Sequence, residues 1–224
     1  MRFSNGRTIR HVVWDWNGTL LNDVFACVEA LNAILKWREL PPVAEQDYRR
    51  AFDFPVQEYY RALGLPCGGD EWRALTRIFH EHYAAASRRA ALRDGVPEVL
   101  AGLRRRGMPM SVLSASEVTI LERMIRERGI RDYFEHVRGL DNLDAHSKWD
   151  IGGELFAALE ASAAEVLLVG DTTHDFEVAQ RLGCDCLLLA GGHQSVERLR
   201  PCGCPVAETP AAILEAVKRR GARP

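Results

Sequence analysis

Polar and charged side chains follow several apolar runs of this sequence, at the points where those runs end. One apolar run ends at Asp15, another ends at Ser114, and the run EVLLVG is followed by Asp171. Asp175 stands four residues after Asp171, and Lys148 stands just ahead of an amphipathic segment. Three carboxylates, a hydroxyl and an amine together offer a nucleophile, ligands for a cation and donors to an anion.

The chemistry that this set favours is phosphoryl transfer. A phosphate ester is an anion that carboxylates alone would repel, so the charge of Asp15, Asp171 and Asp175 calls for a hard cation such as Mg²⁺. Lys148 and the hydroxyl and backbone amides near Ser114 are suited to hold phosphate oxygens. We expect Asp15 to attack phosphorus, giving an aspartyl-phosphate that water then releases.

Each of these residues also has a plainer interpretation when it is taken alone. An Asp before Asn-Gly is commonly a turn residue, which applies to Asp15. Ser114, Thr172 and Asp175 could cap helices, and Lys148 could be a solvated surface residue. Their joint occurrence at the ends of buried runs favours one shared site over these separate roles.

Uninterrupted apolar runs alternate with amphipathic segments along most of the chain. The runs predict buried strands at Ile9–Trp14, Met110–Leu113, Val166–Val169 and Cys186–Leu189. Helical spacing of apolar residues predicts helices at Pro97–Arg106, Glu117–Arg128, Trp149–Ala161 and Phe176–Leu182. This alternation indicates an α/β fold with a parallel sheet covered by helices on both faces. Ligands of such sheets bind outside the carboxyl ends of the strands.

The stretch from Asn22 to Arg93 departs from this alternation, because it shows helical patterns and no strand pattern. We therefore expect an all-helical unit at residues 22–93, inserted into an α/β core formed by residues 1–21 and 94–224. Substrate would enter between the two units, and closure of the helical unit would exclude water. The candidates for facing this cleft are Tyr59, Tyr60 and Arg61.

Four stretches, in order along the chain, resemble the motifs of the haloacid dehalogenase superfamily: DWNGTL, VLSAS, AHSKWD and LLVGDTTHDFEVAQRLGC. Each lies at the expected place on a strand or helix, and the resemblance covers the whole chain. Most members are magnesium-dependent phosphatases, so the resemblance implies a Rossmann-like core with an inserted helical cap, a Mg²⁺ cofactor and a small phosphorylated metabolite as substrate. The size and the helical insertion are similar to those of phosphoglycolate phosphatases.

The resemblance also implies roles for single residues. The implied catalytic residues are Asp15, Asn17, Ser114 and Lys148. The implied metal ligands are Asp15, Asp171, Asp175 and the backbone carbonyl of Asn17. The implied substrate-binding residues are Gly18, Thr19, Ser114, Ala115 and Lys148, and Thr19 also buttresses the first motif.

Asn17 departs from the family, whose phosphatases carry an Asp there that protonates the leaving oxygen and then activates water. An amide can do neither, and such acid–base help is typically worth about 10²–10⁴-fold in rate. The explanation that we favour is a phosphatase whose substrate has a good leaving group, or which uses another acid such as His174 or a histidine of the helical unit. The alternatives are a phosphonate-cleaving enzyme and a module that binds a phosphorylated ligand without turnover. Cleavage of a phosphonate through a Schiff base would need Lys36, the only lysine in residues 22–93.

The bulk composition narrows the class of partner. The chain has 224 residues, 47% of them hydrophobic, and a formal net charge of −2, which argues against binding to nucleic acid or to anionic membranes. No apolar run approaches the ~20 residues of a membrane span, and MRFSNGRTIR lacks the apolar stretch of a signal peptide. We therefore expect a cytoplasmic protein with reduced cysteines. The sequence leaves the oligomeric state and the choice of phosphate ester open.

Two Cys-x-Cys pairs near the C-terminus raise the alternative of a structural zinc. They begin at Cys184 and Cys202. Structural zinc sites usually have about two to four residues between paired cysteines, so apolar packing of these thiols is the interpretation that we favour. His193 follows the strand that ends at Leu189 and is either an ordinary loop residue, which we favour, or a substrate contact.

Overall fold

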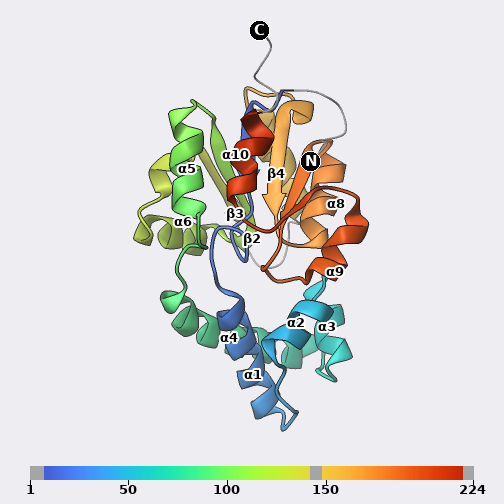
Figure 1. The fold of residues 1–224 in the computed structure, drawn as a ribbon. Helices are drawn as coiled ribbons and strands as arrows, with labels where there is room; N and C mark the ends of the chain where they lie inside the picture. The colour runs from blue at the N-terminus through green and yellow to red at the C-terminus, as the bar shows by residue number, and fades with distance from the viewer. Residues whose placement is uncertain (1–7, 142–147, 219–224) are drawn as a thin grey trace.

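The computed structural model describes residues 8–141 and 148–218 of the chain. Within these ranges the chain forms a six-stranded sheet in the order β3-β2-β1-β4-β5-β6, in which every pair of neighbouring strands is parallel. Helices cover both faces of the sheet (Figure 1). The predicted α/β fold class is therefore confirmed. The two ends of the expected core and the residues AHS of the AHSKWD motif lie outside the described residues.

The elements have the following bounds. The strands are β1 (His11–Trp14), β2 (Met110–Glu117), β3 (His136–Leu140), β4 (Val166–Gly170), β5 (Asp185–Leu189) and β6 (Val206–Ala207). The helices around the sheet are α5 (Val96–Arg105), α6 (Val118–Glu127), α7 (Lys148–Ala158), α8 (Thr173–Leu182), α9 (Val196–Leu199) and α10 (Ala211–Lys218). The helices between β1 and α5 are α1 (Val24–Trp37), α2 (Glu45–Ala51), α3 (Val56–Ala62) and α4 (Gly69–Ala86). Short 3-10 turns are η1 (Ser87–Arg89), η2 (Arg131–Tyr133), η3 (Ala163–Glu165) and η4 (Arg200–Cys202).

Strand β1 lies at the centre of the sheet, between β2 and β4. Trp14 aligns with Val112 of β2 and with Val169 of β4, so the carboxyl ends of these three strands meet at one edge. The chain adds β2 and β3 on one side of β1 and then crosses over to add β4 on the other side. A crevice at such a reversal of strand order is the usual ligand site of an open α/β sheet.

Alternating side chains of β1 face two separate apolar layers, as the period of two of a strand requires. Val12 and Trp14 pack in a cluster that includes residues of α5, α6 and α10. Val13 packs in a second cluster that includes residues of α7, α8 and α9. The residues of the central strands β1 and β4 are buried on both faces, which explains their uninterrupted hydrophobic runs.

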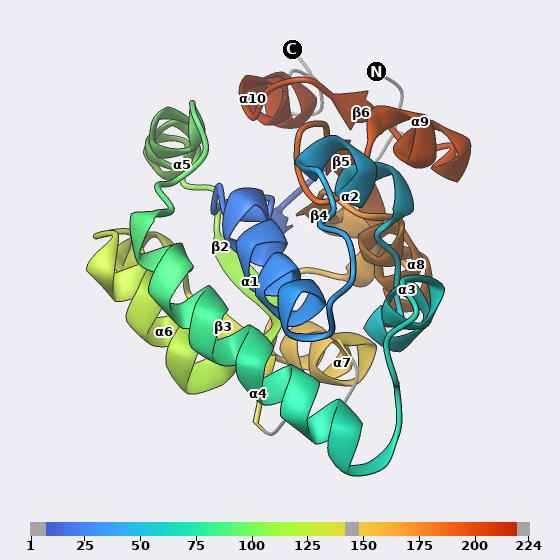
Figure 2. The same cartoon turned by 90° about the horizontal axis from the view of Figure 1, so that it is seen from below.

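The helices α1 to α4 form an apolar cluster of their own, which includes Leu31, Tyr48, Tyr60 and Leu75. They lie below the carboxyl ends of the strands in Figure 1, and Figure 2 shows them from that side. The two chain segments that connect them to the sheet run side by side, because Asn22 N donates to Ala91 O and Arg93 N donates to Leu20 O, each at 2.9 Å. The division of the chain at residues 22 and 93 stays a prediction, which the separate cluster and the paired connections support.

Strands β3 and β6 lie outside the four apolar runs that predicted strands. Strand β3 has the sequence HVRGL and is half buried, with alternating partly exposed and buried positions, and β6 has two residues. Both lie at the edges of the sheet, where one-sided burial and short length weaken the hydrophobic signal. None of the helices within residues 8–141 and 148–218 combines the length and the apolarity needed to cross a membrane.

Candidate functional site

Three carboxylates are buried together at the carboxyl ends of β1 and β4. Asp15 follows β1, Asp171 follows β4, and Asp175 lies in the first turn of α8. Their exposed fractions are 7%, 0% and 2%. One ligand oxygen from each lies within 4.8 Å of those of the other two. The structure therefore brings together three of the acidic residues that the sequence proposed as metal ligands.

Lys148, the first residue of α7, reaches into this acidic group. Its Nζ donates to Asp15 Oδ1 and, at 2.6 Å, to Asp175 Oδ1. Burial alone would lower the pKa of Lys148, but the two carboxylates outweigh burial and raise the pKa above its usual range. The ammonium group therefore stays charged at neutral pH, and the plainer interpretation of Lys148 as a solvated residue is wrong, since it is 5% exposed.

The surroundings of Asp15, the candidate nucleophile, disfavour its negative charge. Burial raises the pKa of Asp15 to about 8, and the charges of Asp175 and Asp171 add to this effect while Lys148 opposes it. Oxygen donors are the ligands that Mg²⁺ prefers, and around an octahedral ion they lie about 3–4 Å apart. The three carboxylates, with ligand oxygens within 4.8 Å of one another, thus offer the type of donor that Mg²⁺ prefers.

Neighbouring groups fix the orientation of the two later carboxylates. Thr19 Oγ1 donates to Asp171 Oδ1 at 2.7 Å, and the backbone N–H of His193 donates to Asp171 Oδ2 at 2.6 Å. Asp175 Oδ2 accepts from the hydroxyl of Thr172 at 2.7 Å and from its N–H at 3.0 Å. Thr172 is the N-cap residue of α8 in a reciprocal capping box with Asp175, so Asp175 both caps this helix and faces Lys148.

Three glycines allow the backbone to approach these carboxylates. A Cβ atom on Gly18 would lie 2.3 Å from Asp171 Oδ2, one on Gly170 would lie 2.2 Å from Asp175 Cγ, and one on Gly192 would lie 2.2 Å from Asp171 Oδ2. Gly18 also has φ +70°, which favours glycine. The contribution of Gly18 is thus close backbone packing at the acidic group.

The predicted second motif lies beside the first. Ser114 is 1% exposed and its hydroxyl accepts from Ser116 N at 3.1 Å, while Ala115 is exposed. The register of β2 shifts between Leu113 and Glu117, so the strand leaves regular pairing where these residues stand. Ser116 Oγ donates to Asn17 Oδ1 at 2.8 Å, which joins the loop after β1 to the end of β2.

Several residues at the site were missed or misjudged from the sequence. Asp23 is fully buried and accepts from Gly18 N at 2.8 Å. Tyr83 of α4 donates to Asp23 Oδ2 at 2.7 Å. The hydroxyl of Tyr48 in α2 and Nδ1 of His193 share a hydrogen bond of 3.0 Å, and His193 is 5% exposed. His193 is thus part of the wall of the site, and the favoured interpretation of an ordinary loop residue is wrong.

The remaining candidates belong to the helices α1 and α3. Tyr59 and Tyr60 are buried in the α1–α4 cluster, and Arg61 is exposed and paired with Glu58 at 2.6 Å. Lys36 is exposed at the far end of α1, about 20 Å along the helix axis from its start. The Schiff-base alternative therefore receives no support.

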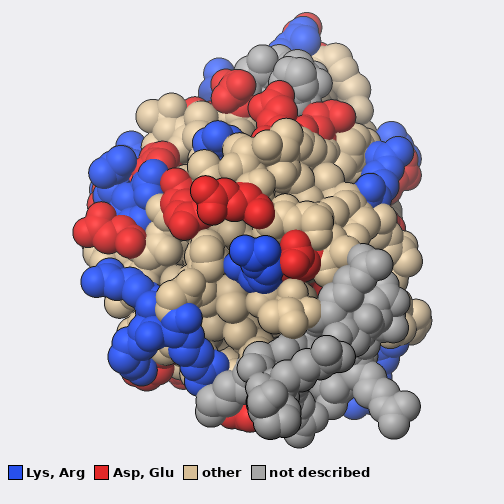
Figure 3. Space-filling view, turned by 90° about the horizontal axis from the view of Figure 1, so that it is seen from above, with Lys and Arg blue, Asp and Glu red and all other residues tan. Residues whose placement is uncertain are grey.

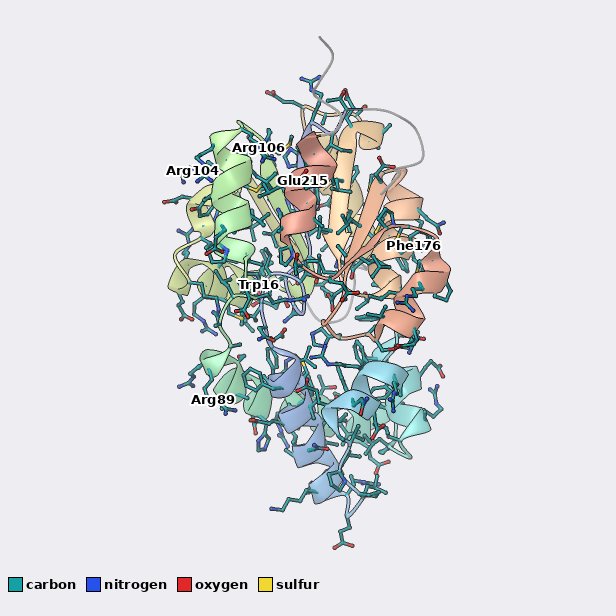
Figure 4. All side chains as sticks on the ribbon, viewed as in Figure 1. Trp16, Arg89, Arg104, Arg106, Phe176 and Glu215 are labelled. Carbon is teal, nitrogen blue, oxygen red and sulfur yellow. The ribbon has the colours of Figure 1, made fainter. Side chains whose placement is uncertain are left out.

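Two tryptophans and a histidine near the site pack against apolar or aromatic side chains. Trp14 and Trp16 are fully buried in the same apolar cluster, and Figure 4 shows Trp16 at the end of the core that faces the helices α1 to α4. His174 stacks on Phe54, with ring centroids 4.7 Å apart, and burial lowers its pKa. His174 thus joins α8 to the chain between α2 and α3.

The second group of metal-ligand types within the described residues consists of Asp23, Cys27 and His193. Both oxygens of Asp23 already accept hydrogen bonds from the protein, so we do not assign a metal to it. The four cysteines of the Cys-x-Cys pairs do not form such a group among these residues, and they pack against the apolar layer under α8 and α9. Apolar packing is therefore the better account of these thiols.

The chain is similar in sequence and in structure to known proteins. A model of the family described as haloacid dehalogenase-like hydrolase matches residues 12–189. The chain is 27% identical over 208 residues to a phosphoglycolate phosphatase of Synechococcus elongatus, covering 92% of this chain and 96% of that protein. It is 27% identical over 192 residues to the tyrosine-protein kinase PtkA of Mycobacterium tuberculosis, covering 85% of this chain and 65% of that protein. A haloacid dehalogenase-like family hydrolase of Streptococcus pneumoniae has a similar structure, with a TM-score of 0.81 at 18% identity, over 93% of this chain and 98% of that one.

Proposed function

The chain belongs to the haloacid dehalogenase-like hydrolase family, and we propose that it is a Mg²⁺-dependent phosphatase that hydrolyses a small phosphomonoester through an aspartyl-phosphate on Asp15. The observation that carries this proposal is the buried group of Asp15, Asp171, Asp175 and Lys148 at the carboxyl ends of β1 and β4. A nucleophile, cation ligands and a fixed positive charge meet there, which is what transfer of an anionic phosphoryl group requires.

Mg²⁺ would be held by Asp15, Asp171, Asp175 and the backbone carbonyl of Asn17, and it would offset the repulsion between these carboxylates and phosphate. Lys148 supplies a second positive charge, which contacts both Asp15 and Asp175. The hydroxyl of Ser114 and the backbone N–H of Ala115 are the proposed donors to the remaining phosphate oxygens. Gly18 and Thr19 act indirectly in this proposal, through their contacts with Asp171.

The reaction has two steps on Asp15. A carboxylate oxygen of Asp15 attacks phosphorus, the bond from phosphorus to the ester oxygen breaks, and that oxygen leaves with the electron pair. Water then attacks the phosphorus of the aspartyl-phosphate, its proton passes to the departing phosphate, and the carboxylate of Asp15 is restored. Asn17 has no proton to give to the leaving oxygen, so the first step depends on how well that oxygen carries negative charge.

We further propose that residues 22–93 act as a cap over this site and that residues 1–21 and 94–224 form the core. The support is the separate apolar cluster of α1 to α4 and the position of Tyr48 and Tyr83, which reach from these helices to residues around Asp15. Closure of such a cap would exclude water from the aspartyl-phosphate until the leaving group has departed.

A small phosphorylated metabolite is the proposed substrate. The name of the cyanobacterial relative makes 2-phosphoglycolate the first ester to test. At the end of the core away from α1 to α4, Lys and Arg side chains lie interspersed with Asp and Glu (Figure 3). Among the described residues, the charge of that face is therefore mixed rather than uniformly basic.

The test is a set of phosphate esters assayed with Mg²⁺ and with excess EDTA: 2-phosphoglycolate, phenyl phosphate, p-nitrophenyl phosphate and acetyl phosphate. We expect Mg²⁺-dependent hydrolysis that is abolished in Asp15→Asn. We also expect kcat/KM to rise steeply with the acidity of the leaving group, because no acid protonates it. Hydrolysis that survives Asp15→Asn, or no hydrolysis of any ester, would overturn the proposal, and the second result would favour a module that binds phosphate without turnover.

A further inference from the structure

Asn17 is held by side chains from three different elements. Its Nδ2 donates to Asp23 Oδ2 at 2.7 Å and to the hydroxyl of Tyr83 at 2.8 Å, and its Oδ1 accepts from Ser116 Oγ at 2.8 Å. Both N–H groups of this amide are thus already used within the protein. The side chain of Asn17 therefore acts as a connector between the loop after β1, the end of β2 and helix α4.

Asp23 is the centre of this network. It is fully buried and is the N-cap residue of α1, yet its side chain makes no capping hydrogen bond to that helix. Instead its Oδ1 accepts from Gly18 N at 2.8 Å, and its Oδ2 accepts from Asn17 Nδ2 and from the hydroxyl of Tyr83. A fully buried carboxylate is costly unless such donors satisfy it, so these donors set the conformation of the loop that begins at Asp15.

Tyr83 is the member of the network that comes from α4, and it is separated from Asn17 by 66 positions in the sequence. Its hydroxyl donates to Asp23 and accepts from Asn17. Both hydrogen bonds therefore join α4 to the segment after β1. Removal of this helix from the core would take one donor from Asp23 and one acceptor from Asn17 at the same time. The loop then loses two of the contacts that fix Asn17 and Gly18.

We propose that Asp23 and Tyr83 are positioning residues, which fix Asn17 and Gly18 beside the nucleophile only while α4 is docked against the core. The conformation of residues 15–23 is thereby coupled to the position of the helices α1 to α4. Asn17 is the complement of Asp23 in this arrangement, because an Asp at residue 17 would place two carboxylates where an amide and a carboxylate now share hydrogen bonds.

The first experiment measures hydrogen exchange by mass spectrometry on peptides that cover residues 15–23, in the full chain with Mg²⁺ at neutral pH. Tyr83→Phe removes the hydroxyl and keeps the ring, and we expect exchange of these amides to become about tenfold faster. Tyr59→Phe is the matched control, because the hydroxyl of Tyr59 is buried and has no hydrogen-bond partner among the residues that the structure describes. Equal exchange in Tyr83→Phe and in the parent chain would overturn the coupling.

A second experiment, which measures kcat and KM, rests on the proposed function. With an ester that the parent chain hydrolyses, Tyr83→Phe is expected to lower kcat about tenfold while KM changes by less than about twofold, since the loop and not the substrate contact is altered. Unchanged kcat together with faster loop exchange would overturn the positioning role. If no ester is hydrolysed at all, the proposed function fails, and the exchange measurement still decides the coupling.

Swapping the side chains of Asn17 and Asp23 gives a third test. Asn17→Asp alone is expected to speed exchange of residues 15–23 at least as much as Tyr83→Phe, because it adds a carboxylate at 2.7 Å from Asp23 Oδ2. The double variant Asn17→Asp/Asp23→Asn again pairs one amide with one carboxylate, and it should return the exchange rates to within about threefold of the parent. Additive effects of the two substitutions would contradict the pairing.

Discussion

At the scale of single residues, Gly18 is the point where backbone conformation and the acidic group depend on each other. Its φ is +70°, and Asp171 occupies the space that a Cβ would need. Asp171 in turn is held in place by Thr19 and by the N–H of His193. Any side chain at residue 18 must therefore displace a carboxylate whose orientation the fold otherwise fixes.

Gly18→Ala is expected to weaken Mg²⁺ binding at least about tenfold and to lower the free energy of unfolding by more than the ~1–2 kcal/mol that a left-handed alanine costs. Gly107→Ala is the matched control, because Gly107 has φ +64° and nothing within 4 Å of its would-be Cβ. Isothermal titration calorimetry with Mg²⁺ and urea denaturation check both effects. Equal losses of stability and equal Mg²⁺ affinity in the two variants would show that the contact with Asp171 is unimportant.

At the scale of the secondary-structure elements, the pairing of β1 with β2 contains a buried polar contact. His11 of β1 is 2% exposed, and its Nε2 lies 2.9 Å from Ser111 Oγ of β2. Burial lowers the pKa of His11 to about 4, and His136 adds to this effect. The imidazole is therefore neutral in the folded chain at neutral pH, whereas in the unfolded chain it titrates near its usual pKa of about 6.5.

His11 is expected to make stability depend on pH between about 6.5 and about 4. In this window the unfolded chain binds a proton at His11 that the folded chain does not. The contribution of His11 to the free energy of unfolding is therefore complete above pH 6.5 and is lost as the pH is lowered. The full shift corresponds to about 3 kcal/mol. His11→Gln removes the titration, so urea denaturation should show a smaller loss of stability between pH 7 and pH 4.5 than in the parent chain. Equal losses in the two proteins would refute the assignment.

The elements also show what the sequence could and could not predict. The central strands were predictable because burial on both faces leaves an uninterrupted apolar run, and their ends placed Asp15 and Asp171 at one edge. Tyr83 and Tyr48 were not predictable, because helical periodicity says which residues of α4 and α2 face an apolar neighbour but not which hydroxyl reaches a distant loop. The position of Asp23, an acid directly before a helix, suggests a helix cap. Its side chain instead bonds to Asn17, Gly18 and Tyr83 and makes no capping hydrogen bond to α1.

At the scale of the whole molecule, the helices α1 to α4 also contact the core at the residues that follow His193. Ser195 N donates to Arg49 O at 2.8 Å, and Arg198 Nη1 donates to Phe52 O at 2.8 Å. Gln194 is fully buried between them: its Nε2 donates to Phe52 O at 3.0 Å and its Oε1 accepts from Thr173 N at 2.7 Å. This contact lies next to His193 and therefore beside the acidic group.

Gln194→Ala is expected to lower the free energy of unfolding by about 2 kcal/mol, because it leaves Thr173 N without its acceptor and takes from Phe52 O one of its two donors. It should also loosen α2 from the core, which would appear as faster limited proteolysis between residues 38 and 55. Gln46→Ala, at an exposed glutamine of α2, is the control and should change neither measurement. Proteolysis of Gln194→Ala at the rate of the parent chain would show that Gln194 is not needed to hold α2 against the core.

The side-by-side connections at residues 20–22 and 91–93 have a consequence for the length of chain that can be inserted between them. Because the polypeptide departs from the sheet and returns to it at neighbouring points, the excursion in between adds nothing to the span that the flanking segments must bridge. The entropy of closing such an excursion grows only with the logarithm of its length. A shorter or longer insertion between these two segments would therefore leave the strand connectivity, and with it the positions of Asp15 and Asp171, unchanged.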